Sequence, residues 1–488
     1  MRTKRLFAVL SVIALLAAAV SARAESAGLT PAQAAAINRY VVAEMARERI
    51  PGAEVGVYRD GKAVLEKGYG LANVELRAPV SAATPMQSGS VGKQFAATAV
   101  MMLVEQGKVG LEDSIVRYFP DTPASWRPIK VKNLLSHTSG LAEYESDERT
   151  KPGGPFDLRQ DFTEDELVRK IEALPIEFNP GDKWDYRNTN YVLLGVLIHR
   201  VTGMAYGDFL HAKIFAPLGM TSTRIISDRD IIAGRAAGYE LEGGRLKNQN
   251  FVSATFNSTA DGTLYFNVVD LEKWDRALYG ETLIKKASLD RMWTPFVLND
   301  GKANAAGYGF AWAVAAVNGH RLIAHSGAWQ GFTCYIGRYV DDRLTVVVLT
   351  NLDAGHATPN NIARVVAGLA DPALMPPTAQ PIADARPEIA LRAHAMLEKM
   401  LAGADVTSDF SATAGYRFEA TDAADLRGNL PSGWAGAPLI LVRRTEADDV
   451  VTSLFRTGKA GDTRLVRVGT DAAGKIADFA VRADPDNR

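Results

Sequence analysis

Ser90 and Lys93 are the pair of residues whose types and spacing most clearly predict chemistry in this sequence. They form the only Ser-x-x-Lys pair in the 488 residues, and an apolar run that Gly107 ends follows them. We expect a turn feeding a helix whose first turn carries both side chains on one face. A lysine desolvated by apolar neighbours can take the proton of a serine hydroxyl, and the N–H groups of a helix N-terminus can stabilise an oxyanion. The spacing therefore predicts a nucleophile beside its own base.

Two other motifs that place a serine or a lysine in a glycine-rich turn do not fit. A nucleophile elbow needs glycine two residues before the serine, where the chain has Ser88. A phosphate-binding loop needs glycine at the position of Gln87 and a hydroxyl residue at the position of Gln94.

Tyr186 and Asn188 form a second candidate pair, directly before the apolar helix expected from Tyr191. A tyrosine near a lysine ammonium can pass a proton to a leaving group, and an asparagine amide can bind a substrate amide. A Tyr-x-Asn triplet alone is weak evidence. Tyr265 and Asn267 fit the same pattern, and from this triplet alone a packed aromatic is the preferred interpretation of Tyr186.

A third cluster, His325-Ser326-Gly327-Ala328, follows an apolar strand. Gly327 removes a side chain where a ligand must approach the backbone, and Ser326 supplies a hydroxyl. We expect the N–H groups of Ser90 and Ala328 to form an oxyanion hole. An ordinary turn at the end of a strand remains the alternative.

The elements around these clusters predict an α/β fold. Strand patterns occur at both ends of the first 370 residues, and the chain between Ser90 and about Trp293 reads as mainly helical. Strands from the two ends are expected to share one sheet, with the helices as an insertion. The local signals are a capped helix over 31–49, hairpin turns at Asp60-Gly61, Asn318-Gly319 and Asp341-Asp342, and a helix near 358–369.

In this order, Ser-x-x-Lys, Tyr-x-Asn and His-Ser-Gly resemble the motifs of the penicillin-recognising serine hydrolases. The likeness is strongest to the class C β-lactamases, D-Ala-D-Ala carboxypeptidases, D-aminopeptidases and family VIII esterases, and it covers roughly residues 27–370. It implies a β-lactamase/transpeptidase-like sheet, with Ser90 as nucleophile, Lys93 as base and Tyr186 as proton relay. It also implies substrate contacts from Asn188 and from His325 to Ala328. The likeness favours Tyr186 over Tyr265, and it leaves one departure, because β-lactamases of this group usually have lysine where His325 stands.

The two ends of the chain predict an exported protein with an accessory domain. Residues 1–24 combine a basic start, an apolar core and Ala22-Arg23-Ala24, which is typical of a signal peptide cleaved after Ala24. We therefore expect a periplasmic or secreted protein with no membrane span after cleavage. We place a β-lactamase-like domain at 25–371, a proline-rich linker at 372–386 and a small α+β domain at 387–488, with a helix over 387–401 and strands near 416–419, 439–444, 450–456, 464–468 and 478–481.

The composition limits the kinds of partner and cofactor that we expect the protein to bind. Hydrophobic residues make up 47% of the chain and charged residues 23%, and the formal net charge is −1. This balance argues against a large nucleic-acid-binding surface. Cys334 is the single cysteine, so no disulfide can form within the chain. The seven histidines show no close ligand pair and His137 is expected to be structural, so we predict no metal site and no cofactor.

The predicted function is a serine hydrolase that acts through an acyl-enzyme on small esters, D-amino-acid peptides or β-lactams. An esterase or D-stereospecific peptidase is favoured over an efficient β-lactamase because of His325. The alternatives are a true β-lactamase, or a non-catalytic sensor that binds penicillin or peptidoglycan. Lys93 argues against a sensor, since binding alone does not need it. The sequence predicts no oligomeric state.

Overall fold

The computed structural model describes residues 28–242, 244–353, 357–411, 430, 434, 436–447, 450–459 and 462–484. The predicted signal peptide and the candidate strand at 416–419 lie outside the described residues. The first described helix, α2 (Pro31–Glu48), begins with the expected capping box between Thr30 and Gln33.

Within the described residues, seven antiparallel strands form the main sheet, in the order β3-β2-β1-β12-β11-β10-β9. The pairing of β1 with β12 joins the N-terminal and C-terminal pieces, which confirms the predicted α/β sheet. The strands are β1 (Gly52–Arg59), β2 (Lys62–Asn73), β3 (Ala78–Pro79), β9 (Ala313–Val317), β10 (His320–Trp329), β11 (Phe332–Tyr339) and β12 (Leu344–Thr350).

Two of the predicted hairpin turns have the backbone conformation that their residues favour. Asp60 and Gly61 have φ angles of 54° and 70°, and Asn318 and Gly319 have 53° and 84°. Left-handed conformations at both central residues match the twist of the flanking strands.

Strand β10 differs from the prediction at its end. We expected a strand that stops before His325, but β10 continues to Trp329 because residues 325–329 pair with β11. Strand β9 pairs only as far as Ala324, so the other edge of residues 325–329 has no partner strand within the described part of the chain.

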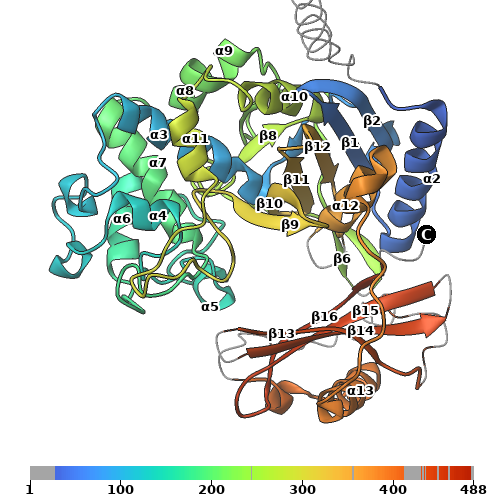
Figure 1. Ribbon diagram of the computed structural model, residues 1–488. Helices are drawn as coiled ribbons and strands as arrows, with labels where there is room; N and C mark the ends of the chain where they lie inside the picture. The colour runs from blue at the N-terminus through green and yellow to red at the C-terminus, as the bar shows by residue number, and fades with distance from the viewer. Residues whose placement is uncertain are drawn as a thin grey trace, which may run out of the picture.

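Helices cover both faces of this sheet (Figure 1). Helices α2 and α12 (Pro359–Ala370) pack on one face, with a hydrophobic core that includes Ile37, Val348 and Val366. The helical insertion, which includes α10 (Val268–Ala277), lies on the other face. It covers a larger core that includes Phe95 and Trp274.

The insertion is mainly helical, as predicted, but in the described residues four short strands interrupt it and a fifth, β4, lies just before Ser90. Its helices are α3 (Lys93–Glu105), α4 (Val131–Leu135), α5 (Asp147–Thr150), α6 (Glu164–Glu172), α7 (Asn188–Thr202), α8 (Tyr206–Leu210), α9 (Ala216–Leu218), α10 and α11 (Lys286–Met292). The short strands are β4 (Met86–Gln87), β5 (Arg224–Ile225), β6 (Tyr239–Glu242), β7 (Arg245–Asn248) and β8 (Leu264–Phe266). Strand β8 pairs with β4 and β5, so residues 264–266 of the insertion are held beside the chain just before Ser90.

The C-terminal segment has a core of its own. Helix α13 (Pro387–Leu401) packs on a sheet whose described strands are β13 (Ile440–Ala447), β14 (Val450–Lys459), β15 (Asp462–Thr470) and β16 (Ile476–Ala483). Residues 372–386 also contact this sheet, because Ile382 donates a backbone hydrogen bond to Leu441 and Arg444 pairs with Asp384 at 2.7 Å. The stretch between the two cores is therefore attached to the C-terminal sheet. The division of the chain into domains at 371/372 and 386/387 stays a prediction.

Candidate active site

Ser90 lies in a tight turn between two glycines. Residues Gly89–Gly92 form a 3₁₀ turn, and the α-helix begins only at Lys93, one turn later than predicted. Gly89 explains the tight turn, because its φ is +43° and a Cβ atom there would lie 2.3 Å from the N atom of Ala328. The 3₁₀ turn still brings Ser90 and Lys93 together, as the spacing predicted.

Lys93 is completely buried, and its ammonium group has three hydrogen-bond acceptors. Its Nζ atom lies 2.9 Å from Oγ of Ser90 and 2.7 Å from Oδ1 of Asn188, and it also donates to the carbonyl oxygen of Asp261. A buried amine held by three acceptors can occupy only a narrow range of positions. Lys93 is therefore fixed at the distance at which a proton passes between it and Ser90.

Tyr186 closes the same space from the side of α7. Its ring centroid lies 5.0 Å from Nζ of Lys93, and His137 stacks beneath it with centroids 4.2 Å apart. Its buried hydroxyl has no hydrogen-bond partner among the described residues. Burial raises the pKa of this hydroxyl, although Lys93 and Ser90 oppose the shift. Tyr186 is therefore a protonated phenol that can donate to an incoming group.

Tyr265, the other tyrosine that fitted the motif, lies elsewhere. It is in β8, and its hydroxyl lies 3.5 Å from Nη1 of Arg235. Asn267 caps α10 by accepting a hydrogen bond from Asp270. The structure thus brings Tyr186, and not Tyr265, to Ser90.

His137 has the structural position that the sequence predicted. It is fully buried, and its Nδ1 lies 3.2 Å from the backbone N of Arg187 and 3.3 Å from Nδ2 of Asn190. Burial holds its pKa well below the ordinary value, with Lys93 adding to the effect. A neutral ring is the form that stacks against Tyr186.

Two carboxyl groups, those of Glu143 and Glu145, contact Asn188, and sequence reasoning missed both. Glu143 accepts a hydrogen bond from the backbone N of Asn188 at 2.5 Å, and Glu145 accepts one from its Nδ2 at 2.6 Å. Burial, together with Asp261 and Glu143, raises the pKa of Glu145 to about 8. No motif contains Glu143 or Glu145. The signal that could have found them is the excess of acidic residues in the predicted loop after residue 140.

Asn188 is the first residue of α7, and both ends of its amide are engaged. Its Oδ1 accepts from Lys93 and its Nδ2 donates to Glu145. Each end of the amide can make one further hydrogen bond, so the predicted contact with a substrate amide is compatible with these bonds. In the resting protein Asn188 orients Lys93.

Strand β10 lies against the 3₁₀ turn of Ser90 in the region where the oxyanion hole was predicted. Strand β10 passes so close to the 3₁₀ turn that a Cβ atom on Gly327 would lie 2.2 Å from the O atom of Ser88 and 3.0 Å from the N atom of Ser90. A Cβ atom on Gly89 would lie 2.3 Å from Ala328 N, as described above. Glycine at both positions is therefore required for β10 to lie this close to the turn of Ser90, and the oxyanion hole itself stays a prediction.

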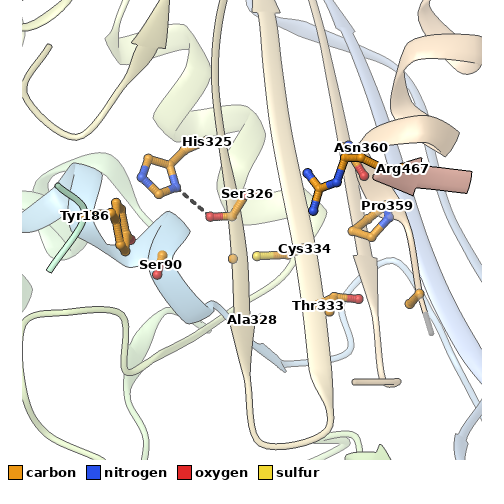
Figure 2. Close-up of a pocket in the computed structure, with 12 residues that line it drawn as sticks. Ser90, Tyr186, His325, Ser326, Ala328, Thr333, Cys334, Pro359, Asn360 and Arg467 are labelled. Atoms are coloured by element: carbon orange, nitrogen blue, oxygen red, sulfur yellow. Dashed lines mark hydrogen bonds between the residues drawn. The ribbon is translucent and has the colours of Figure 1, made fainter. Parts of the chain in front are cut away.

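His325 is buried in the wall of the site, with both ring nitrogens hydrogen-bonded. Its Nδ1 donates to the carbonyl oxygen of Ser326 at 2.5 Å, as Figure 2 shows, and its Nε2 lies 2.8 Å from the hydroxyl of Tyr308. The carbonyl can only accept, so Nδ1 carries the proton and Nε2 accepts from Tyr308. Burial and the charge of Lys93 lower the pKa of His325 to about 4. We expected His325 to gain positive charge as the pH falls. With this pKa it does so only near pH 4.

A cavity of about 510 Å³ opens beside Ser90, and residues of β10, β11, the start of α12 and β15 line it. Tyr186 and residues 325–328 line its first part, and Thr333, Cys334, Pro359, Asn360 and Arg467 line its far part (Figure 2). A second, small cavity of about 20 Å³ lies on the other side of Ser90, next to Glu145 and Asp261.

In the described residues no three His, Cys, Asp or Glu side chains are grouped to hold a metal ion. A search of the same residues for a helix long and apolar enough to cross a membrane finds none.

The family model described as Beta-lactamase matches residues 37–371, more than half of the chain. The chain belongs to the Beta-lactamase family, a family of serine hydrolases. This confirms the resemblance drawn from the three motifs.

Two curated relatives show the range of the family. The chain is 32% identical over 308 residues to "Penicillin-binding protein 4*" of Bacillus subtilis, covering 60% of this chain and 66% of the relative. It is 29% identical over 307 residues to "D-aminopeptidase" of Brucella anthropi, covering 62% of this chain and 57% of the relative. The chain thus spans somewhat less than two thirds of the length of these relatives.

One solved structure is similar to more of the chain than residues 37–371, which the family model matches. The octameric penicillin-binding protein homologue from Pyrococcus abyssi has a TM-score of 0.62 and 25% identity, over 89% of this chain and 90% of that chain. A match over 89% of 488 residues must include residues after Asp371. The family match at residues 37–371 agrees with the expected extent of the resemblance, and this structure is in addition similar to part of the C-terminal segment.

Proposed function

We propose that the protein is a serine hydrolase that cleaves small esters or D-amino-acid peptides through an acyl-enzyme on Ser90. The observation that carries the proposal is the 2.9 Å contact between Oγ of Ser90 and Nζ of a completely buried Lys93. A serine without a base is a weak nucleophile, and this contact supplies the base.

The reaction begins when Oγ of Ser90 attacks the substrate carbonyl carbon and neutral Lys93 takes the hydroxyl proton. The backbone N–H groups of Ser90 and Ala328 bind the resulting oxyanion. The intermediate collapses as the leaving group receives a proton from the hydroxyl of Tyr186, which Lys93 reprotonates. Water then attacks the acyl-enzyme, and the same groups return the proton to Oγ of Ser90 as the acid is released.

The choice of substrate rests on His325. A neutral histidine with both nitrogens engaged does not offer a carboxylate the positive charge that a lysine would. The D-aminopeptidase relative supports a D-amino-acid substrate, and the basic, apolar and small-residue pattern of residues 1–24 supports export.

Covalent labelling tests the proposal. The purified protein is treated with a fluorescent fluorophosphonate and, separately, with a fluorescent penicillin, and the adduct is located by mass spectrometry of peptides. We expect a fluorophosphonate adduct on Ser90 that is lost in Ser90→Ala and kept in Ser258→Ala, an exposed serine outside these two cavities.

Ester turnover measured in the same samples should fall at least about 10³-fold in Ser90→Ala. A protein that binds penicillin without an adduct on Ser90 and without turnover would be a sensor. Absence of any adduct on Ser90 from either probe would overturn the proposal.

A further inference from the structure

The small cavity beside Ser90 has the size of a single water molecule. Its volume is about 20 Å³, and a space of about 10–15 Å³ is enough to hold one water that has two or more polar partners. Ser90 and Ala328 line both this cavity and the large one, so a carbonyl group bound at Ser90 lies between the two. The large cavity has room for the acyl group of a substrate, which leaves the small cavity to water.

Glu145 offers an acceptor to this small cavity. One carboxyl oxygen, Oε2, accepts a hydrogen bond from Nδ2 of Asn188 at 2.6 Å. The other, Oε1, accepts none from the residues that the structure describes, and the side chain lines the cavity. This second oxygen is therefore available to a water molecule.

Asp261 is the other carboxyl group that lines the small cavity, but both of its oxygens are engaged. Oδ1 accepts from Oγ1 of Thr259 at 2.5 Å, and Oδ2 accepts from the hydroxyl of Tyr144 at 2.7 Å. Lys93 and Tyr186 are absent from the described lining of this cavity. Glu145 is thus the base that a water in the small cavity can reach.

The chain around Glu145 is fixed before any substrate binds. The backbone N of Glu145 donates to Oε1 of Glu143 at 3.0 Å. Next to it, the backbone N of Tyr144 donates to Oγ1 of Thr189 in α7 at 2.9 Å, and the Tyr144 hydroxyl holds Asp261. A base that is already in position loses no free energy to reorganisation when the reaction takes place.

The charged groups that face Glu145 give it a suitable affinity for a proton. Burial, Asp261 and Glu143 raise its pKa to about 8, whereas Lys93 and the hydrogen bond from Asn188 oppose the shift. General bases are most effective when their pKa lies close to the working pH. Glu145 meets this condition in neutral and mildly alkaline solution.

We propose that Glu145 is the general base that activates the water for hydrolysis of the acyl-enzyme, and that this water is held in the small cavity beside Ser90. The proposal rests on the acyl-enzyme function proposed above, and it adds a catalytic residue that none of the three motifs contains.

The step is balanced in atoms and charge. The carboxylate of Glu145 takes a proton from the water while the water oxygen bonds to the acyl carbonyl carbon. The bond between that carbon and Oγ of Ser90 then breaks, and Oγ takes the proton of the Tyr186 hydroxyl. Glu145 releases its proton to solvent and Tyr186 takes one up, so each cycle consumes one water and leaves the protein unchanged.

Acetylation by p-nitrophenyl acetate separates the two half-reactions in the full chain. The ester is removed by rapid gel filtration, and the acetyl group on Ser90 is followed by intact-protein mass spectrometry with peptide mapping. The variants are Glu145→Gln, Glu145→Asp and the control Asp147→Asn. Asp147 is an exposed carboxylate close to Glu145 in the sequence and lies outside both cavities.

We expect Glu145→Gln to slow loss of the acetyl group at pH 8 by about 10²-fold or more, since general bases contribute about 10²–10⁴-fold. Glu145→Asp should keep part of the rate and Asp147→Asn all of it. The burst of p-nitrophenol at pH 7 should change by less than about threefold in Glu145→Gln, because Glu145 is mostly neutral there. An unchanged burst also shows that the variant is folded.

Hydroxylamine distinguishes a missing base from a damaged site, because this nucleophile attacks an ester without a general base. It should restore rapid loss of the acetyl group in Glu145→Gln. The unmodified protein gives an independent reading: its rate of deacetylation should rise with pH and level off above about pH 8, as Glu145 becomes a carboxylate. This rise should be lost in Glu145→Gln.

Three results would overturn the proposal. They are deacetylation of Glu145→Gln within about threefold of the unmodified rate, a rise towards pH 8 that the variant keeps, or slow deacetylation in Tyr186→Phe with a normal rate in Glu145→Gln. Turnover by Glu145→Gln without accumulation of its acetyl-enzyme counts as a normal rate.

Failure of the acyl-enzyme function itself gives a different result. In that case neither p-nitrophenyl acetate nor the fluorophosphonate leaves an adduct on Ser90. An adduct that forms normally and is lost equally fast with and without the carboxylate of Glu145 would leave the acyl-enzyme function intact and overturn only the role of Glu145.

Discussion

The side-chain amide of Asn188 donates a 2.6 Å hydrogen bond to Glu145 while its oxygen accepts from Lys93, so the carboxyl group and the amine are linked through one residue. Burial raises the pKa of Glu145 to about 8, and Asp261 and Glu143 add to the shift. Glu145 is therefore mostly protonated at neutral pH and gains its charge as the solution becomes mildly alkaline.

Glu145→Gln should remove the change near pH 8 that ionisation of Glu145 gives to the pH profile of kcat/KM. The charge that Glu145 gains there lies close to the proposed base, because Asn188 is hydrogen-bonded to both Glu145 and Lys93. The variant keeps an acceptor for Asn188 but cannot become charged. The measurement is ester turnover between pH 5.5 and 9.5 under kcat/KM conditions.

The control for this profile is Glu446→Gln, because Glu446 is an exposed carboxylate on β13. Its profile should overlay that of the unmodified protein. A change near pH 8 that persists in Glu145→Gln would show that Glu145 does not produce it.

Tyr186→Phe should lower kcat/KM by about 10²–10⁴-fold, because it removes the hydroxyl that we assign to protonation of the leaving group. The aromatic stack with His137 is kept. Tyr265→Phe is the matched control, since its hydroxyl faces Arg235, and its kcat/KM should change by less than about twofold. The effect should be larger for an amide than for a p-nitrophenyl ester, whose leaving group needs no proton. Equal losses for both substrates would argue against the assigned role.

The parts of the site that local patterns control could be predicted from the sequence. Turn residues at Asp60-Gly61 and Asn318-Gly319 placed two hairpins, and the spacing of Ser90 and Lys93 placed them on one face. The pairing of β1 with β12 also followed, because apolar strand patterns at both ends of one segment need a common sheet.

The contacts that depend on distant parts of the chain could not be predicted. The carbonyl oxygen of Asp261 accepts from Lys93 only because β8 pairs with β4, immediately before Ser90. Glu145 and Arg467 reach the site from a loop and from another sheet, and neither belongs to a motif. The extension of β10 to Trp329 was missed because Gly327 is unfavourable in an isolated strand, whereas here it lets β10 touch the turn of Ser90.

Asp275→Asn should destabilise the protein by about 3–5 kcal/mol, because it leaves a buried arginine without its counter-charge. Asp275 and Arg338 are both completely buried, with Oδ1 and Nε 2.7 Å apart, and Thr345 donates to the same oxygen at 2.6 Å. The pair joins α10 to β11 beneath the sheet. The free energy of unfolding from urea denaturation is the measurement.

Asp290→Asn is the matched control, because Asp290 forms an exposed pair with Lys286. Its effect should stay below about 1 kcal/mol. A loss of similar size in both variants would mean that burial does not determine the contribution of the Asp275–Arg338 pair.

The last prediction concerns His325 and substrate preference. Because burial and Lys93 lower its pKa from the ordinary 6.5 to about 4, His325 binds a proton only in strongly acidic solution. Between pH 5.5 and 7.5 it stays neutral, and its attraction for a carboxylate should not change in that range. We therefore expect slow turnover of a chromogenic cephalosporin and faster hydrolysis of a short p-nitrophenyl ester or a D-Ala-D-Ala peptide. The kcat/KM values of the three substrates are measured at pH 5.5, 6.5 and 7.5. We expect that titration of His325 causes no change in the ratios between these values. A cephalosporin value exceeding both others by roughly a hundredfold, a transition-state difference of about 2.7 kcal/mol, would show that His325 does not set the preference and that the protein acts as a β-lactamase.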